Sequence, residues 1–295
     1  EAHLGFLIDY TYDGPGIKVK SVPDRSPWSF SDVKLSPGDV VLKINGKEAS
    51  RTESLAPILA GQAGREVTYS VRNASGTTRD IKARAISSGE FNELVFRNLL
   101  DKRRRYVEAK SSGRVTYVQI AGMSGPELTR FQQQVWQYTR DKKALIIDVR
   151  NNGGGNTSDK IIDILERRQN SNYVLRDEDP IRGPGQALGL PMVVMANETS
   201  FSNAEMFPSA MKARNLATIV GKPTPGYVIY TYGLNLVDGT SARMPSTGVY
   251  RLDGTPMENE GQRPDYEVEW TAEQYFNGDD PQLDKAIEVL LKSIK

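Results

Sequence analysis

Apolar and polar positions follow a short-period pattern in the first third of the chain. Between residues 4 and 86, short β-like runs alternate with turn sequences that contain DGPG, SPGD, NG and SGT. One short helix-like segment, residues 54–60, interrupts them. The pattern predicts a small β-rich domain with strands at Phe6–Tyr10, Ile17–Val22, Val40–Ile44, Val67–Val71 and Asp80–Ala85.

The rest of the chain follows a longer period. After a charged, helix-permissive connector at residues 89–112, β-like runs alternate with amphipathic helical patterns, and the last helix begins at Asp280–Pro281. Buried strands are expected at 114–120, 144–149, 192–196 and 217–220, and a β meander at 227–252. Strands that alternate with helices favour a largely parallel sheet with helices packed on it.

The stretch from residue 192 to 207 has the pattern of a nucleophile turn. A buried strand, Met192–Ala196, breaks into the small and polar segment Asn197–Asn203, and a helix-like run follows. Several hydrolase folds present a serine at such a bend, beside backbone N–H groups that stabilise negative charge. Position alone does not choose among the nearby hydroxyl residues, which are Thr199, Ser200, Ser202 and Ser209.

Ser202 also has a purely structural interpretation. Glu205 follows it by three residues, so the pair forms a capping box at the start of the helix. Helix caps are commoner than nucleophiles, so the local pattern alone favours the cap.

A glycine run, Gly153–Gly155, follows the expected strand at 144–149 and precedes a helix. It matches neither a Walker loop nor a dinucleotide fingerprint, and taken alone it could be a simple strand-to-helix turn. If the strands are parallel, this run and Ser202 lie at the same edge of the sheet. One backbone donor from each would form an oxyanion hole.

The amino-acid composition excludes several kinds of catalytic and metal site. The 38 basic and 37 acidic residues leave a net charge of +1, which gives no reason to expect a nucleic-acid partner, and no apolar stretch approaches the roughly 18 residues of a membrane span. The absence of cysteine excludes disulfides and a thiol nucleophile. His3 is the only histidine, so a zinc site of several histidines is excluded and any imidazole base must be His3. We expect no metal and no cofactor.

The chain does not begin with Met, and we expect it to be a fragment of a longer protein. Any targeting signal would then lie outside the sequence, and a cytoplasmic or a periplasmic location stays open.

Several motifs resemble known proteins. LSPGDVVLKINGKEAS, from Leu35, resembles PDZ domains, which bind chain ends or extended peptides. DVRNNGGG, NETSFSNAE and GKPTPG together resemble the carboxyl-terminal-processing family of serine peptidases, in which a PDZ domain accompanies the peptidase domain. One branch of that family uses a lysine 25 residues after the serine. That position is Tyr227 here, and the closest lysine, Lys222, is the alternative base.

The tricorn protease branch of the family is the better match. SNAEMFPSA, GKPTPG, MENEGQRPDYEVE and DDPQLDKAIEVL resemble its segments, and Ala2-His3-Leu4-Gly5 resembles the context of its histidine. The resemblance implies Ser202 as nucleophile, His3 as general base and Glu258 as the acid, with Glu260 as the alternative acid. It also implies that Gly155 and Asn203 donate backbone N–H groups to the oxyanion.

The implied fold combines α+β and α/β parts: a small β-rich PDZ domain followed by a crotonase-like α/β sandwich peptidase domain. The expected division is 1–5 as the end of a preceding domain that carries His3, 6–88 as the PDZ-like domain, 89–112 as a helical connector and 113–295 as the serine peptidase core.

The expected function is cleavage of peptides or unfolded polypeptides, with activity falling as the pH drops below the histidine pKa of about 6.5. The resemblance also implies a homo-oligomer. Tyr227, Asn203 and Ala2 depart from the family pattern and motivate an alternative, a catalytically inactive PDZ-containing peptide-binding protein. A third hypothesis is an acyl-transfer enzyme of the crotonase type that binds coenzyme A.

Overall fold

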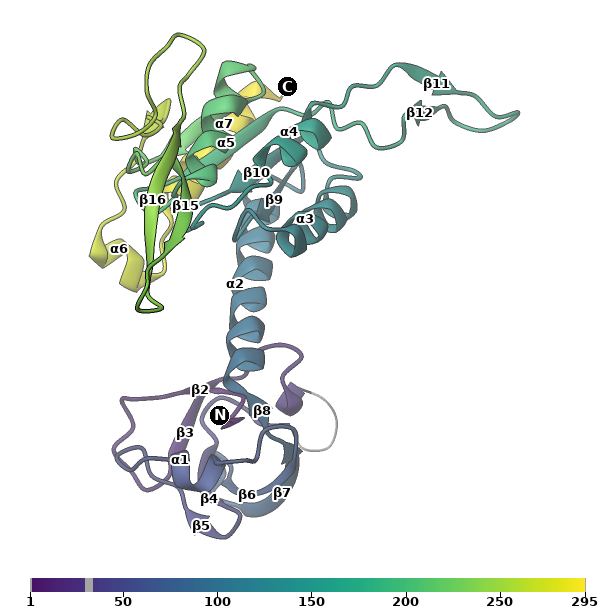
Figure 1. Cartoon of the computed structure of the whole chain (residues 1–295). Coiled ribbons are helices and arrows are strands. Elements are labelled where there is room, and N and C mark those ends of the chain that lie inside the picture. Colours follow the sequence, from purple (N-terminus) through teal and green to yellow (C-terminus); the bar gives the residue numbers. More distant parts are fainter. Residues whose placement is uncertain (1, 30–33, 295) are drawn as a thin grey trace. The chain divides into compact units, whose positions relative to one another are not determined.

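The computed structural model describes residues 2–29 and 34–294. The other residues, 1, 30–33 and 295, fall in the expected segments 1–5, 6–88 and 113–295 and lie outside the described residues. The chain divides into two compact units, Glu1–Lys102 and Arg103–Lys295, and each is described by itself (Figure 1). The smaller unit is β-rich and the larger one is α/β, as the two sequence patterns predict.

The smaller unit is built on a sheet with the strand order β2-β3-β4-β6-β7 and with β5 paired to β4. Its core contains the fully buried aromatic side chains of Phe6, Trp28 and Tyr69. The elements are β2 (Leu7–Ile8), β3 (Ile17–Ser21), η1 (Pro27–Ser29), β4 (Val40–Ile44), β5 (Lys47–Glu48), α1 (Ala56–Leu59), β6 (Glu66–Arg72) and β7 (Thr78–Arg84).

Residues 2–4 pack as part of this unit. Strand β1 (Ala2–His3) pairs antiparallel with β8 (Ile86–Ser87), and the side chains of Ala2 and Leu4 are buried in the core of the unit. The indole N–H of Trp28 donates to the carbonyl oxygen of Leu4 at 2.6 Å. His3 therefore lies on an anchored strand. The expected boundaries between the four segments of the chain stay a prediction.

The expected connector is one continuous helix, α2 (Ser88–Lys110). The described part of the chain contains no helix that is both long enough and apolar enough to cross a membrane.

The larger unit is organised around a parallel sheet with the strand order β17-β14-β13-β10-β9. Alternate residues of β10, such as Leu145 and Ile147, face a core that they share with α3, α4 and α5. Helix α7 packs on the sheet as well and buries Leu283 and Leu290. The elements are β9 (Val115–Gln119), α3 (Gly125–Tyr138), β10 (Ala144–Asp148), α4 (Ser158–Glu166), β13 (Met192–Ala196), α5 (Asn203–Ala213), β14 (Ala217–Gly221), β17 (Tyr266–Glu267), α6 (Ala272–Asn277) and α7 (Pro281–Ser293).

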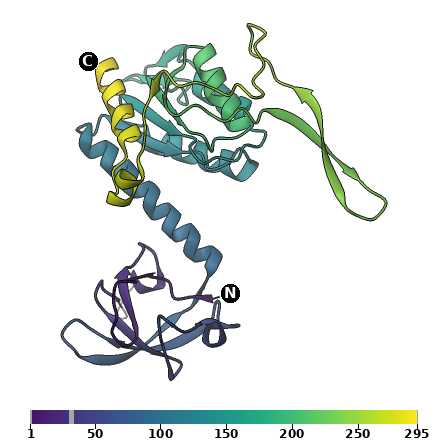
Figure 2. The same cartoon turned by 90° about the vertical axis from the view of Figure 1, so that its left-hand side faces the viewer.

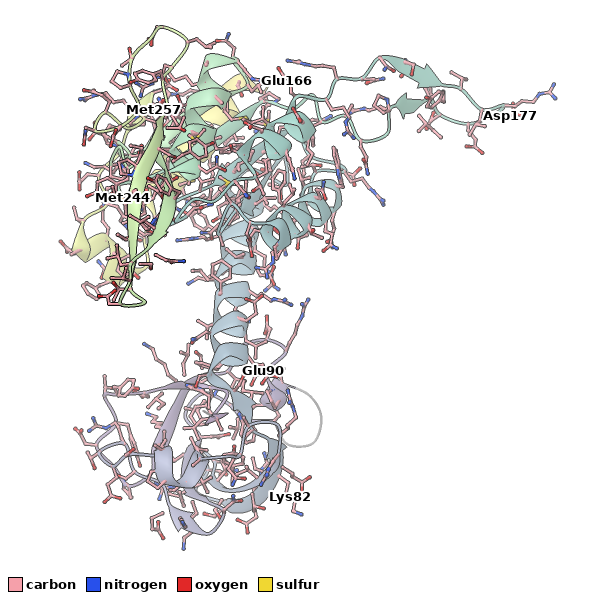
Figure 3. All side chains as sticks on the ribbon, viewed as in Figure 1. Lys82, Glu90, Glu166, Asp177, Met244 and Met257 are labelled. Atoms are coloured by element: carbon pink, nitrogen blue, oxygen red, sulfur yellow. The ribbon has the colours of Figure 1, made fainter. Side chains whose placement is uncertain are left out.

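Two hairpins extend from the larger unit. The first pairs β11 (Ser171–Tyr173) with β12 (Ile181–Gly183), and Asp177 lies at its tip (Figure 3). The second pairs β15 (Ile229–Asn235) with β16 (Ser241–Gly248), and Figure 2 shows it reaching away from the sheet. The region expected to be a β meander is therefore mainly one long two-stranded hairpin.

Candidate active site

Three neighbouring strands end at one edge of the parallel sheet. Strand β13 lies between β10 and β14, and the loops that follow these strands begin at Val149, Asn197 and Lys222. The crevice at the carboxyl ends of parallel strands is the usual ligand site of open α/β sheets. The glycine run and the serine-bearing turn leave two of these strands, as the sequence predicts.

Ser202 occupies a strained turn between β13 and α5. Its backbone has φ 54° and ψ −116°, a combination that costs a non-glycine residue of the order of 1–3 kcal/mol. The expected capping box is present, because the Glu205 carboxylate accepts from the Ser202 N–H at 3.0 Å. The N–H of Glu205 also donates to the backbone carbonyl oxygen of Ser202 at 2.8 Å, so the hydroxyl is not the sole acceptor for this N–H. The capping and nucleophile interpretations of Ser202 are therefore compatible.

Two of the competing hydroxyl groups are committed to the turn itself. Thr199 Oγ1 donates to Asn151 Oδ1 at 2.6 Å. Ser200 is fully buried, and its hydroxyl donates to the carbonyl oxygen of Val149 at 2.9 Å. Both bonds tie the serine-bearing turn to the loop after β10. Ser202 is the hydroxyl of this turn that such bonds leave available for chemistry.

The glycine run lies directly against Ser202. A Cβ atom on Gly154 would lie 2.9 Å from the Cβ of Ser202 and 3.2 Å from the nitrogen of Asn203, so only glycine fits there. Gly155 has φ +145°, and a Cβ there would overlap the carbonyl oxygen of Met123. The N–H of Gly154 donates to Asn152 Oδ1 at 2.9 Å, whereas those of Gly155 and Asn203 have no hydrogen-bond partner among residues 2–29 and 34–294. The two donors expected from the resemblance are thus available to a ligand.

The side chain of Asn203 has a structural task. Its Oδ1 accepts from the N–H of Ser158 at 2.9 Å, and its Nδ2 donates to the Ser158 hydroxyl at 2.8 Å. The amide therefore joins the first turn of α5 to the first turn of α4. An aspartate could also hold this contact, by accepting from both the N–H and the hydroxyl of Ser158.

The segment that carries Glu258 and Glu260 packs against the loop after β14. The N–H of Asn259 donates to the carbonyl oxygen of Gly226 at 2.8 Å. The carboxylates of Glu258 and Glu260 are exposed, and neither makes a hydrogen bond or ion pair within the described part of the chain. The choice between them as the acid stays open.

The ring of His3 is held by a stacking contact on one face and by a hydrogen bond at its edge. The ring stacks on Phe91 with centroids 3.7 Å apart, and the N–H of Gly5 donates to Nδ1 at 3.1 Å. Since Nδ1 accepts, the proton of the neutral ring is on Nε2. Partial burial lowers the pKa of His3 below its ordinary value of 6.5, so the ring is neutral at pH 7.

The alternative base is poorly suited to the role. Lys222 Nζ lies 2.5 Å from Glu269 and 3.1 Å from Glu267, and these hydrogen bonds raise its pKa. A raised pKa keeps the ammonium group protonated, which is the opposite of what a general base needs. Tyr227, at the position where one branch of the family has its lysine, stacks on Phe201 with centroids 5.5 Å apart.

A buried ionic cluster beneath the site was not predicted from the sequence. The guanidinium of Arg150 pairs with Asp148 at 2.8 Å and with Asp280 at 2.9 Å, and also donates to Gln282. Burial alone would raise the pKa of Asp148, but Arg150, with help from Arg103, holds it below its ordinary value. The cluster fixes the start of the loop that carries the glycine run. The sequence signal was Asp148 inside an otherwise apolar expected strand, with Arg150 directly after its end.

The fold and this edge of the sheet define a class: a peptidase-type α/β unit with a PDZ-type β-rich unit before it. A model of peptidase family S41 matches residues 114–268, and a model of the tricorn protease PDZ domain matches residues 6–88. The chain belongs to peptidase family S41, serine-type peptidases, and is of the tricorn-like kind.

Individual proteins agree with this assignment. The tricorn protease of Thermoplasma volcanium is 28% identical over 92% of this chain, and tricorn protease homolog 1 of Streptomyces coelicolor is 31% identical over 93% of it. The chain spans 26% of the length of each of these relatives. A crystal structure of the tricorn protease matches 99% of this chain and 29% of its own chain, with a TM-score of 0.87 and 25% sequence identity.

Proposed function

We propose that this chain is the catalytic core of a serine peptidase that cleaves peptides or unfolded polypeptides. The observation that carries the proposal is the position of Ser202. Its hydroxyl stands on a strained turn at the start of α5, beside the free N–H of Asn203 and against the glycine run. A nucleophile and nearby oxyanion donors are elements that acyl transfer requires.

In the proposed reaction the Ser202 hydroxyl attacks the scissile carbonyl carbon while the imidazole of His3 takes its proton. The carbonyl oxygen becomes an oxyanion that accepts from the N–H groups of Gly155 and Asn203. Collapse of the tetrahedral intermediate expels the amine, which takes the proton from the imidazolium. Water then attacks the acyl-enzyme with the imidazole again as base, and this releases the second product and the free serine.

The role of His3 sets a requirement on its hydrogen bonds. In the described conformation Gly5 occupies the lone pair of Nδ1 and the proton is on Nε2, so neither nitrogen offers a lone pair to a serine. Catalysis by His3 therefore requires a change of its tautomer or of its hydrogen-bond partner. We assign Glu258, with Glu260 as the alternative, to stabilise the imidazolium and to fix its tautomer. The PDZ-like unit is proposed to aid substrate binding, and the whole protein to be a homo-oligomer.

The alternative function is peptide binding without turnover on the same scaffold. The observations that favour it are the occupied Nδ1 of His3 and the aromatic stack of Tyr227 on Phe201 in place of a lysine. In that case Ser202 is only the first residue of a capped helix, and the PDZ-like unit carries the function.

A turnover assay on an internally quenched peptide library separates the two functions. We expect the wild-type chain to cleave peptides, and Ser202→Ala to lose activity by at least about 10³-fold because the nucleophile is absent. Circular dichroism and peptide affinity should stay unchanged in this variant. Equal peptide binding by both proteins, with no cleavage by either, would support the binding function instead.

A further inference from the structure

The carboxylate of Glu205 does more than cap a helix. The side chain has no exposed surface and makes no ion pair with any residue in the described ranges. It accepts three hydrogen bonds. The Ser202 N–H donates to Oε1 at 3.0 Å, the Thr224 hydroxyl donates to Oε2 at 2.5 Å, and the Gly226 N–H donates to Oε2 at 2.6 Å. A buried carboxylate is costly unless donors surround it, and here the donors come from two loops.

The loop after β14 is in turn fixed to the segment of the candidate acids. The N–H of Gln262 donates to the Thr224 hydroxyl at 2.8 Å, and the N–H of Thr224 donates to the carbonyl oxygen of Gln262 at 3.1 Å. The carbonyl oxygen of Gly226 accepts from the N–H of Asn259 at 2.8 Å. Hydrogen bonds therefore run without a break from Ser202, through Glu205 and Gly226, to the residue between Glu258 and Glu260.

We propose that Glu205 is a positioning residue of the peptidase site, which holds the Ser202 turn in register with the acid-bearing segment. The inference rests on the proposed function of Ser202. By accepting the Ser202 N–H, the carboxylate keeps the serine at its positive φ and leaves the next N–H, that of Asn203, free for the oxyanion. By accepting from Gly226, it fixes the loop on which Asn259 rests.

The substitution Glu205→Gln separates this role from simple capping. A capping box accepts glutamine as readily as glutamate, because one carbonyl oxygen suffices for the N-cap N–H. The observed network of three donors on two carboxylate oxygens is not compatible with glutamine, because the NH₂ group would then face the N–H of either Ser202 or Gly226. The matched control is Glu198→Gln, which removes the same charge from an exposed side chain of the same turn.

Steady-state kinetics on the 295-residue chain test the proposal. We expect Glu205→Gln to lower kcat about 10²-fold with KM nearly unchanged. A displaced nucleophile and oxyanion donor reduce the stabilisation of the transition state more than they reduce the binding of substrate. Glu198→Gln should retain wild-type kcat. Ile287→Ala, which removes buried side-chain atoms from α7 away from the site, is the control for lost stability and should also retain kcat at 25 °C. A kcat of Glu205→Gln within twofold of wild type would overturn the proposal.

Amide hydrogen exchange gives a second measurement that does not depend on turnover. The N–H groups of Ser202 and Gly226 should exchange slowly in the wild-type chain and in Glu198→Gln, and at least tenfold faster in Glu205→Gln. Equal exchange in all three proteins would refute the positioning role. Loss of turnover in Glu205→Gln alongside full turnover in Ser202→Ala would instead refute the proposed function and leave the hydrogen-bond network standing.

Discussion

The surroundings of Ser202 and of His3 are built in different ways. Ser202 stands on a strained turn that hydrogen bonds hold from several sides, and the N–H groups of Gly155 and Asn203 beside it have no hydrogen-bond partner in the described part of the chain. His3 lies on a short edge strand of the smaller unit, where the N–H of Gly5 occupies one ring nitrogen and Phe91 covers a face of the ring. The serine side of the proposed site is preorganised, whereas the histidine side is held in an arrangement that chemistry must change.

This difference indicates that the surroundings of His3, more than those of Ser202, would control activity. A preorganised nucleophile needs no rearrangement before the reaction, because folding has already provided the free energy that holds it in its reactive geometry. A base whose lone pair is occupied must first give up a hydrogen bond. We therefore expect variants near Ser202 to change kcat or the free energy of unfolding, because they disturb a geometry that is already in place. Variants near His3 should change how readily the site becomes active.

The largest expected effect is the loss of the base. His3→Ala should lower kcat/KM by about 10²–10⁴-fold, the usual contribution of a general base. His3→Gln, which keeps a polar side chain but cannot accept the serine proton as an imidazole does, should be equally impaired. A fluorogenic peptide assay at pH 8 measures both. Activity within twofold of wild type in both variants would remove His3 from the mechanism.

The next effect concerns the buried ionic cluster of Arg150, Asp148 and Asp280 beneath the serine site. Arg150→Met would leave Asp148 buried without its main cation, and breaking a buried pair in this way costs about 3–5 kcal/mol of unfolding free energy. Urea denaturation followed by circular dichroism measures it. Arg214→Met, which removes an exposed ion pair with Glu166, is the matched control and should cost about 1 kcal/mol or less. Equal losses would mean that the cluster does not hold the loop.

A smaller effect tests the strain at Ser202. Glycine adopts positive φ freely, so Ser202→Gly should raise the free energy of unfolding by about 1 kcal/mol while it abolishes activity. Ser202→Ala keeps the strain and should leave stability nearly unchanged. Ser209→Gly, in the interior of α5, should instead lower stability by about 1 kcal/mol. A destabilised Ser202→Gly protein would show that the turn is relaxed.

The smallest effect is the position of the acid limb of the pH profile. Because burial lowers the pKa of His3, the neutral base persists below pH 6.5, and kcat/KM should fall only as the pH drops through that lowered value. The same shift makes the folded state bind the proton less tightly than the unfolded chain, so His3 stabilises the fold above pH 6.5 and loses this contribution as the pH falls. An acid limb above pH 7 would contradict the burial of His3.

The sheet and the serine turn could be predicted because their signals are local. Buried five-residue runs such as Met192–Ala196 mark the strands, and the order strand, turn and helix places Ser202 and the glycine run at one edge once the strands are parallel. The parallel arrangement itself followed from the alternation of strands and helices. These inferences needed no contact between residues distant in sequence, other than the pairing that parallel strands require.

Other features depend on contacts that no local pattern contains. Glu205 could be predicted as a cap from its spacing to Ser202, but its bonds to Thr224 and Gly226 come from a loop after the next strand. Arg150 pairs with Asp280, which lies 130 residues away. The acceptor role of Nδ1 in His3 depends on the turn at Gly5, where φ is +80°. Tertiary geometry decides all three.

Covalent labelling with a fluorophosphonate probe at pH 8, followed by peptide mapping, tests the central claim most directly. The account predicts a stoichiometric adduct on Ser202, formed much more slowly in His3→Ala and absent in Ser202→Ala. An adduct on Thr199, Ser200 or Ser209 would place the nucleophile elsewhere on the turn or helix. No adduct on any residue of the wild-type chain, under conditions in which the chain cleaves peptides, would contradict a serine nucleophile.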